Sequence, residues 1–148
     1  MYKKVSTDMN FVSREKEVEK FWDDNEIFQK SMDEKEGCPD YIFYDGPPTA
    51  NGKPHIGHVL TRVIKDMIPR YRTMKGYMVP RKAGWDTHGL PVELEVEKLL
   101  GLDGKEQIEE YGLDPFIRQC KESVWKYKGM WEDFSKTVGF WADMDNPY

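Results

Sequence analysis

The sequence predicts an α/β fold built on two parallel strands and the helix that joins them. Short apolar segments at residues 41–44 and 77–80 are typical of buried strands. Between them, apolar residues recur every three or four positions from Ile56 to Tyr71, as in an amphipathic helix. A strand, a crossover helix and a second strand make a βαβ unit, in which the two strands run parallel.

The loops that follow these two strands are expected to meet. Residues 45–55 follow the first strand and residues 84–91 follow the second, and both loops are polar and glycine-rich. Ligands in parallel sheets bind beyond the carboxyl ends of the strands. The two loops should therefore form one binding site.

Further helices are predicted on both sides of this unit. Ser13 is a suitable helix cap, and apolar spacing after it predicts a helix over residues 13–30. Pro69 lies inside the pattern of the crossover helix, so we expect a kink there or a late end near Arg72. Residues 91–100 are predicted to form another helix.

A long helix is predicted towards the end of the chain. Residues 101–112 should contain a helical turn or a short helix. Beyond them, steps of three and four produce one apolar seam on a helix of about 22 residues, roughly 33 Å long. The seam positions are Ile117, Cys120, Val124, Tyr127, Trp131, Phe134 and Val138. We expect this seam to pack on the chain's own sheet.

Composition narrows the class of protein. The 148 residues suit one domain, and the net charge of −5 argues against a sequence-independent nucleic-acid binder. One basic zone is formed by Lys65, Arg70, Arg72, Lys75, Arg81 and Lys82. For this zone, a solvated surface is favoured over an RNA contact. Two distant cysteines match no disulfide framework, and the sequence has no apolar run of about 18 residues. We expect a cytoplasmic monomer that does not enter a membrane.

The first loop carries the features of an anion site. It runs from a strand into a helix N-terminus, where unpaired amides and the helix dipole favour a phosphate. His55 and His58 stand three residues apart and can reach the same phosphate group, either as neutral donors or as cations. Zinc is the alternative ligand, but only His88 and two scattered cysteines remain to complete such a site. We therefore predict no metal site formed by protein side chains.

The second loop offers a carboxylate for a cationic group. Asp86 follows a strand and is flanked by Gly84-Trp85 and Thr87-His88-Gly89. A carboxylate in a partly dry pocket makes strong hydrogen bonds with an ammonium group. An Asx turn or a helix cap is the alternative role for this residue. The sequence pairs neither serine nor cysteine with a base, which favours chemistry at a phosphoryl centre over an acyl-enzyme.

Together, the two loops resemble the catalytic domain of class I aminoacyl-tRNA synthetases. The signature loop corresponds to Pro48-Thr49-Ala50-Asn51-Gly52-Lys53-Pro54-His55-Ile56-Gly57-His58. Residues 84–93 resemble most closely the isoleucine-specific members, and the likeness covers nearly the whole chain. The resemblance implies a Rossmann-like parallel sheet, ATP and Mg²⁺, isoleucine as substrate and tRNA(Ile) as acceptor.

The resemblance also implies roles for single residues in nucleotide binding. His55 and His58 would contact the ATP phosphates and act as the catalytic pair, while Thr49 would lie near the phosphates. Gly57 would lie under the adenine and ribose. With Mg²⁺, the histidines would stabilise charge on the pyrophosphate that leaves when the isoleucine carboxylate attacks the α-phosphorus.

A second group of residues is implied in amino-acid binding. Asp86 would hold the α-amino group of isoleucine, and Gly46 and Pro47 would line the amino-acid pocket. The family also carries an editing domain, a second signature loop, an anticodon-binding region and zinc modules, none of which has a counterpart in this sequence. Residues 1–148 are therefore expected to be the N-terminal half of the catalytic domain, inactive or nearly so alone.

Two other functions remain open at this point. One is a small free-standing nucleotidyltransferase with a similar histidine loop, which would be complete at about this length. The other is a non-catalytic synthetase-like binding module. The presence of His55, His58 and Asp86 argues against lost chemistry, and the motif at residues 84–93 argues against the free-standing enzyme.

Overall fold

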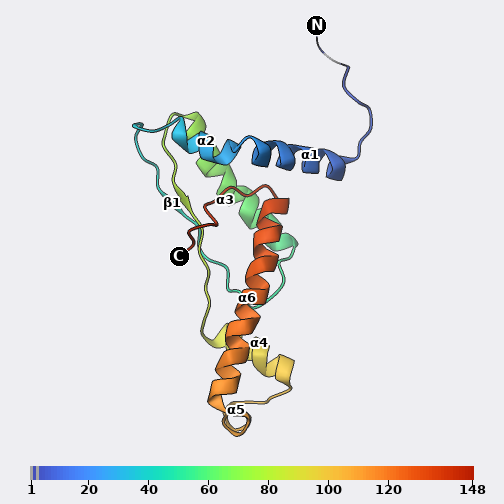
Figure 1. The fold of residues 1–148 in the computed structure, drawn as a ribbon, viewed down its shortest axis with the longest axis vertical. Coiled ribbons are helices and arrows are strands. Elements are labelled where there is room, and N and C mark those ends of the chain that lie inside the picture. The colour runs from blue at the N-terminus through green and yellow to red at the C-terminus, as the bar shows by residue number, and fades with distance from the viewer. Residues whose placement is uncertain (1, 3) are drawn as a thin grey trace.

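The computed structural model describes residue 2 and residues 4–148. Within these residues, the fold consists of six helices and a two-stranded parallel sheet, which lies at one edge of the molecule in Figure 1. In chain order the elements are α1 (Phe11–Asp24), α2 (Ile27–Asp33), β1 (Phe43–Tyr44), α3 (Ile56–Met74), β2 (Arg81–Lys82), α4 (Leu90–Leu100), α5 (Lys105–Tyr111) and α6 (Leu113–Thr137). The predicted α/β class is confirmed.

The central βαβ unit is present, with shorter strands than predicted. Phe43 pairs with Arg81 in a parallel ladder, and α3 connects the two strands. The second strand was predicted at residues 77–80, but the regular ladder begins only at Arg81. The carbonyl of Pro80 accepts a hydrogen bond from Phe43 N at 3.0 Å. Proline has no N–H to donate to the neighbouring strand, so the regular ladder does not include residue 80.

The N-terminal helix differs from its prediction in two respects. Asn10, not Ser13, is the cap, and its side chain accepts a hydrogen bond from Ser13 N at 3.1 Å. The predicted single helix over residues 13–30 is two helices, because Asn25 bonds Phe21 O through both its backbone and its side chain. Glu26 then adopts a left-handed conformation with φ 50°, which separates α1 from α2.

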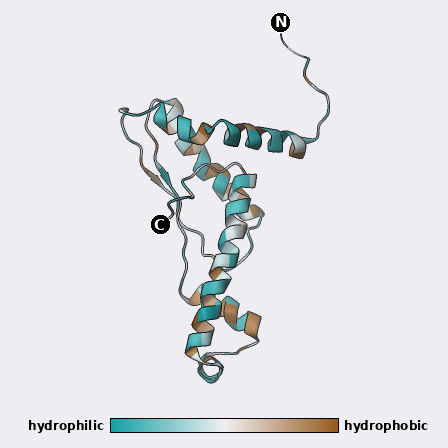
Figure 2. Cartoon of the chain, viewed as in Figure 1, coloured by the Kyte–Doolittle hydropathy of each residue, from teal (hydrophilic) through white to brown (hydrophobic). Residues whose placement is uncertain are grey.

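Helix α6 has the predicted apolar seam and packs against α4, where a sheet contact was expected. The two helices lie side by side in the lower half of Figure 1, and Figure 2 shows hydrophobic positions on α4. A core cluster is formed by Ala50, Val92, Val124, Tyr127 and Trp131. Ala50 belongs to the first loop, so this core anchors the predicted binding loop as well as the two helices.

Helix α3 has its polar side towards the protein and its apolar side outwards. The helix is regular from Ile56 to Met74 and contains Pro69 without ending there. Arg62 and Pro69 are its buried residues. The exposed apolar side chains are Ile56, Leu60, Val63, Ile64, Met67, Ile68, Tyr71 and Met74. We call these eight residues the α3 apolar face.

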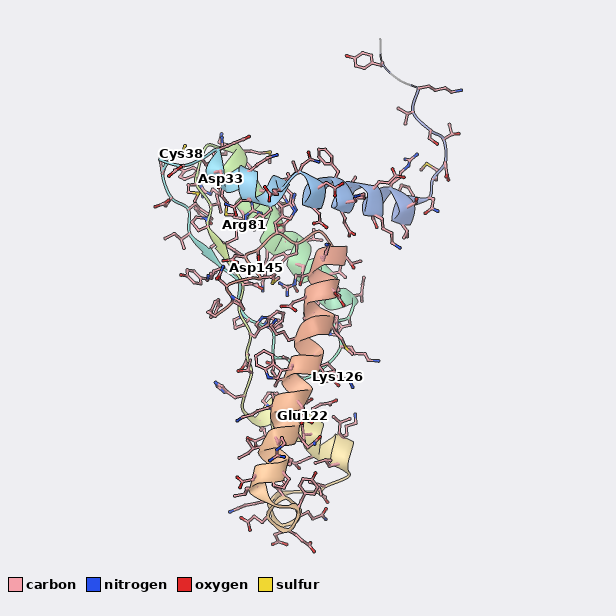
Figure 3. The ribbon with its side chains drawn as sticks, in the orientation of Figure 1. Asp33, Cys38, Arg81, Glu122, Lys126 and Asp145 are labelled. Atoms are coloured by element: carbon pink, nitrogen blue, oxygen red, sulfur yellow. The ribbon has the colours of Figure 1, made fainter. Side chains whose placement is uncertain are left out.

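The basic zone is largely engaged in ion pairs and does not form a free surface. Arg81 of β2, which is labelled in Figure 3, is buried, and burial lowers its pKa to about 10 despite the nearby carboxylate of Asp66. Further pairs join this zone to acidic residues: Lys65 with Asp45, Arg70 with Asp66, and Lys82 with Asp143. The expectation of a solvated surface is therefore wrong for Arg81, whereas Lys65, Arg70 and Lys82 are ion-paired and partly exposed.

Helix length and polarity also bear on membrane contact. In the part of the chain that the structure describes, none of the helices combines the length and the hydropathy needed to cross a bilayer.

Val124→Ala should lower the free energy of unfolding by about 2 kcal/mol, because it leaves a cavity in the core that joins α4 to α6. Urea denaturation measures the change. The matched control is Val63→Ala on the α3 apolar face, where the side chain is 54% exposed and the loss should stay below about 0.5 kcal/mol. Equal losses at both positions would contradict this packing.

Candidate nucleotide site

The two predicted loops meet beyond the carboxyl ends of the strands. Asp86 N donates to Pro48 O at 3.1 Å, and Ala50 N donates to Asp86 O at 3.0 Å. The Thr49 hydroxyl donates to Asp86 Oδ2 at 3.1 Å. The convergence expected from the βαβ order is therefore confirmed, and the carboxylate of Asp86 lies next to Thr49.

His55 and His58 form a reciprocal cap at the N-terminus of α3. His55 is the N-cap residue, and its Nδ1 accepts from Gly57 N at 3.1 Å. In return, Nδ1 of His58 accepts from His55 N at 3.0 Å. The ring centroids lie 3.8 Å apart. His55 therefore precedes the first helical turn, yet the two rings lie side by side as predicted.

This cap determines where the imidazole protons lie. Because Nδ1 of each ring accepts a backbone hydrogen bond, the proton of the neutral ring is on Nε2, which becomes a donor. Burial, followed by the charges of His55 and Arg62, lowers the pKa of His58 below its ordinary value of 6.5. Of the two forms considered for His58, the structure favours the neutral donor over the cation.

Gly57 gives the His55 ring the space it needs. A Cβ at residue 57 would lie 3.0 Å from His55 Cε1 and 3.1 Å from its Nδ1. Any larger residue would push the imidazole out of the position in which it caps the helix. This requirement is additional to the predicted role of Gly57 beneath a nucleotide.

A pocket of about 330 Å³ opens beside this cap. It is lined by Asp45, Gly46, Pro48, Thr49, Asn51, Gly52, Lys53, His58, Thr61, Arg62, Lys65 and Trp131. Three of the predicted site residues are in this lining: Gly46, Thr49 and His58. The other four lie in the loops or helix turn around the pocket: Pro47, His55, Gly57 and Asp86. The charged side chains that line the pocket are three basic ones and one acidic one, and this excess of positive charge favours an anionic ligand.

The acidic residue of the pocket is neutralised by two basic side chains that the sequence analysis did not assign to the site. Asp45 is 1% exposed, and its oxygens contact Arg62 Nη1 at 2.7 Å and Lys65 Nζ at 2.6 Å. A helical-spacing argument could have found the cations, since His58, Arg62 and Lys65 follow at intervals of four and three on α3.

Trp131 is a further residue whose position at the site was missed. It was assigned only to the apolar seam of the long helix, where it is indeed buried. Its indole Nε1 also donates to Gly52 O at 3.0 Å, and its ring meets His58 edge-on with centroids 4.6 Å apart. Helix α6 therefore reaches the binding loop through this side chain.

A larger hollow of about 990 Å³ lies between α1, α2 and residues 139–146. None of the predicted site residues is among the described residues that line it. Within the described residues, no group of three or more His, Cys, Asp or Glu side chains is arranged to hold a metal ion.

Comparison with known proteins agrees with this arrangement. A family model described as tRNA synthetases class I (I, L, M and V) matches residues 17–148. The chain belongs to this family. Over 148 residues it is 63% identical to the isoleucine--tRNA ligase of Clostridium novyi (strain NT) and 60% identical to that of Clostridium acetobutylicum. Isoleucine--tRNA ligase 2 of Bacillus anthracis is 56% identical over 146 residues.

These matches cover almost all of this chain but little of the relatives. The chain spans 14% of the length of each of these three ligases. A crystal structure of the ternary complex of Agrobacterium radiobacter K84 agnB2 LeuRS-tRNA-LeuAMS has the same fold, with a TM-score of 0.71 and 21% identity. That match covers 95% of this chain and 16% of the other.

Asp45→Asn should lower the free energy of unfolding by about 3 kcal/mol, because it leaves the buried Arg62 guanidinium without its counter-charge. Urea denaturation measures the loss. Asp24→Asn is the matched control, since Asp24 and Lys20 form an exposed pair whose loss should cost no more than about 0.5 kcal/mol. A loss at Asp45 no larger than that at Asp24 would show that the pair is not structural.

His58 should titrate below pH 6.5, and the NMR signals of its imidazole nitrogens measure the midpoint. Because folding lowers this pKa, the unfolded chain binds the proton more readily, and stability is lost as pH falls from 6.5 through the folded pKa. The urea-unfolded chain is the control and should titrate near the ordinary histidine value of about 6.5. A midpoint in the folded chain equal to or above that of the unfolded chain would contradict a neutral cap.

Proposed function

We propose that this chain is the N-terminal half of the catalytic domain of an isoleucine--tRNA ligase and that it binds ATP at the N-terminus of α3. The observation that carries the proposal is the His55–His58 cap beside a pocket with an excess of basic side chains. The identity of 56–63% to relatives named isoleucine--tRNA ligase supports the choice of amino acid.

The chemistry proposed for the cap is donation to phosphate oxygens. With Nδ1 engaged in the cap, Nε2–H of each neutral imidazole is available to an anionic oxygen, and the helix dipole adds a positive potential. Charge increases on the phosphate oxygens as the isoleucine carboxylate attacks the α-phosphorus and pyrophosphate leaves. Donors already fixed in place stabilise that charge without reorganisation.

Amino-acid binding is proposed at the neighbouring loop. Asp86 would accept hydrogen bonds from the α-amino group of isoleucine, and Thr49 orients this carboxylate by its bond to Oδ2. Gly46 and Pro47 are exposed next to Thr49, which supports their role in lining the amino-acid pocket. Transfer of the isoleucyl group to tRNA(Ile) would follow in the complete cytoplasmic enzyme.

Mg²⁺ is proposed to arrive with the nucleotide. The carboxylate of Asp45 is occupied by Arg62 and Lys65, so the acidic residue that lines the pocket is poorly suited to a metal ion. Mg²⁺ is commonly bound through the phosphates of its substrate, where it neutralises their charge. The side chains described here would then bind and orient the phosphates.

The assignment to one half of a domain is supported by the α3 apolar face. Eight large apolar side chains on one side of a helix are 42–82% exposed in this chain. Apolar surface of that extent normally lies against further protein. The remainder of the catalytic domain, in the same polypeptide, is proposed to cover it.

ATP–pyrophosphate exchange with isoleucine tests the proposal. The chain alone should exchange far more slowly than the complete enzyme, and an equal rate would contradict the assignment to one half of a domain. In the complete enzyme, Asp86→Asn should raise the KM for isoleucine about tenfold or more, because a charge-assisted hydrogen bond is lost.

The matched control for this substitution is Asp103→Asn, on an exposed loop between α4 and α5. It should leave both KM values unchanged. If Asp86→Asn changed the KM for ATP and left that for isoleucine unaltered, the amino-group role would be wrong.

A further inference from the structure

Trp131 connects the long helix to the binding loop. The side chain is 4% exposed, and its Nε1 donates to Gly52 O at 3.0 Å across 79 residues of sequence. Gly52 lies in a loop of glycines and prolines, whose conformation must be fixed before it can hold a ligand without a large entropy cost. The indole N–H fixes one carbonyl of that loop.

The same indole ring contacts His58. The two rings meet edge to face, with centroids 4.6 Å apart and planes at 68°. His55 lies against His58 from another direction, with ring centroids 3.8 Å apart. Neighbours on two sides restrict rotation of the His58 ring and so set the direction of its Nε2–H.

Trp131 also adjoins a buried cation. The guanidinium of Arg62 lies 5.7 Å from the Trp131 ring centroid and 4.3 Å from that of Phe140. Arg62 is in turn held by the carboxylate of Asp45 at 2.7 Å. A cation over an aromatic face is attracted to it, so the indole and the guanidinium hold each other in position.

We propose that Trp131 is a positioning residue for the nucleotide site, which fixes the Gly52 carbonyl and directs the His58 imidazole towards the bound phosphates. The proposal rests on the proposed function for its ligand. The proposal gives Trp131 a different role from that of Val124, although both belong to the same core cluster. Val124 contributes burial, whereas Trp131 contributes a hydrogen bond and a ring contact to the site itself.

Trp131→Phe is the decisive variant because it keeps an aromatic ring and removes the N–H donor. The chain has three histidines, so the imidazole nitrogen signals of His58 can be resolved by NMR without any ligand. In the wild type, His58 should show an unprotonated Nδ1 and a protonated Nε2. In Trp131→Phe, the Gly52 carbonyl loses its donor and the loop that leads to His55 is freed. The bond from His55 N to His58 Nδ1 then weakens, and these signals should move towards the average of the two tautomers.

ATP titration followed by NMR provides the second measurement. The dissociation constant for ATP should be about tenfold higher in Trp131→Phe than in the wild-type chain, which corresponds to a loss of about 1.4 kcal/mol. Val96→Ala is the control, because Val96 is a buried residue of α4 outside the cluster that contains Ala50 and Trp131. It should lower the thermal midpoint at least as much and leave both the His58 signals and the ATP affinity unchanged. The titratable and charged groups around His58 remain the same in these variants: His55, Lys53, Asp45, Arg62 and Lys65.

Trp131→Leu removes the ring itself and should raise the titration midpoint of His58, since water then reaches the imidazole. If this variant does not fold, Trp131→Phe decides alone. Unchanged His58 signals and ATP affinity in a destabilised Trp131→Phe would overturn the proposal and leave Trp131 a core residue. Absence of ATP binding by the wild type would contradict the proposed function only, because the His58 signals are read without nucleotide.

Discussion

The buried carboxylate of Asp45 is the contact on which the geometry of the site depends. It lies at the carboxyl end of β1 and binds Arg62 and Lys65 of α3. Burying the charges of Asp45 and Arg62 is costly in solvation, so their ion pair is stable only with close geometry, while Lys65 reaches Asp45 from a partly exposed position. The hydroxyl of Tyr148 also donates to Asp45 O. These contacts therefore fix the position of α3, which carries His58, relative to the end of β1.

This contact also accounts for the orientation of α3. An amphipathic helix in a small domain normally turns its apolar side to the core. Here Arg62, Lys65 and Asp66 occupy the inner side, and the α3 apolar face points outwards. The inner side thus supplies the charges that a phosphate site needs. The core between α4 and α6 does not involve that face, so the chain by itself retains this core when the face is uncovered.

The local patterns of the sequence were enough to predict the arrangement that brings the loops together. The order strand, helix, strand implies parallel pairing, and parallel pairing places residues 45–55 and 84–91 at one edge. Asp45 and Arg62 were missed because charged residues are usually solvated, and their pairing depends on how α3 is rotated about its axis. Helical spacing predicts that Trp131 lies in the core, but it does not indicate that the indole also bonds Gly52.

The neutral state of His58 follows from the same geometry and bears on how such a site acts. A protonated imidazole would attract phosphate more strongly, but protonation of Nδ1 would remove the acceptor for His55 N–H and open the cap. Arg62, four residues away on the same face, disfavours a second cation. The positive potential therefore comes from the basic side chains and the helix dipole, which do not depend on pH near neutrality. The imidazoles are left to provide directed hydrogen bonds, whose orientation is set by the backbone bonds of the cap and, for His58, also by the contact with Trp131.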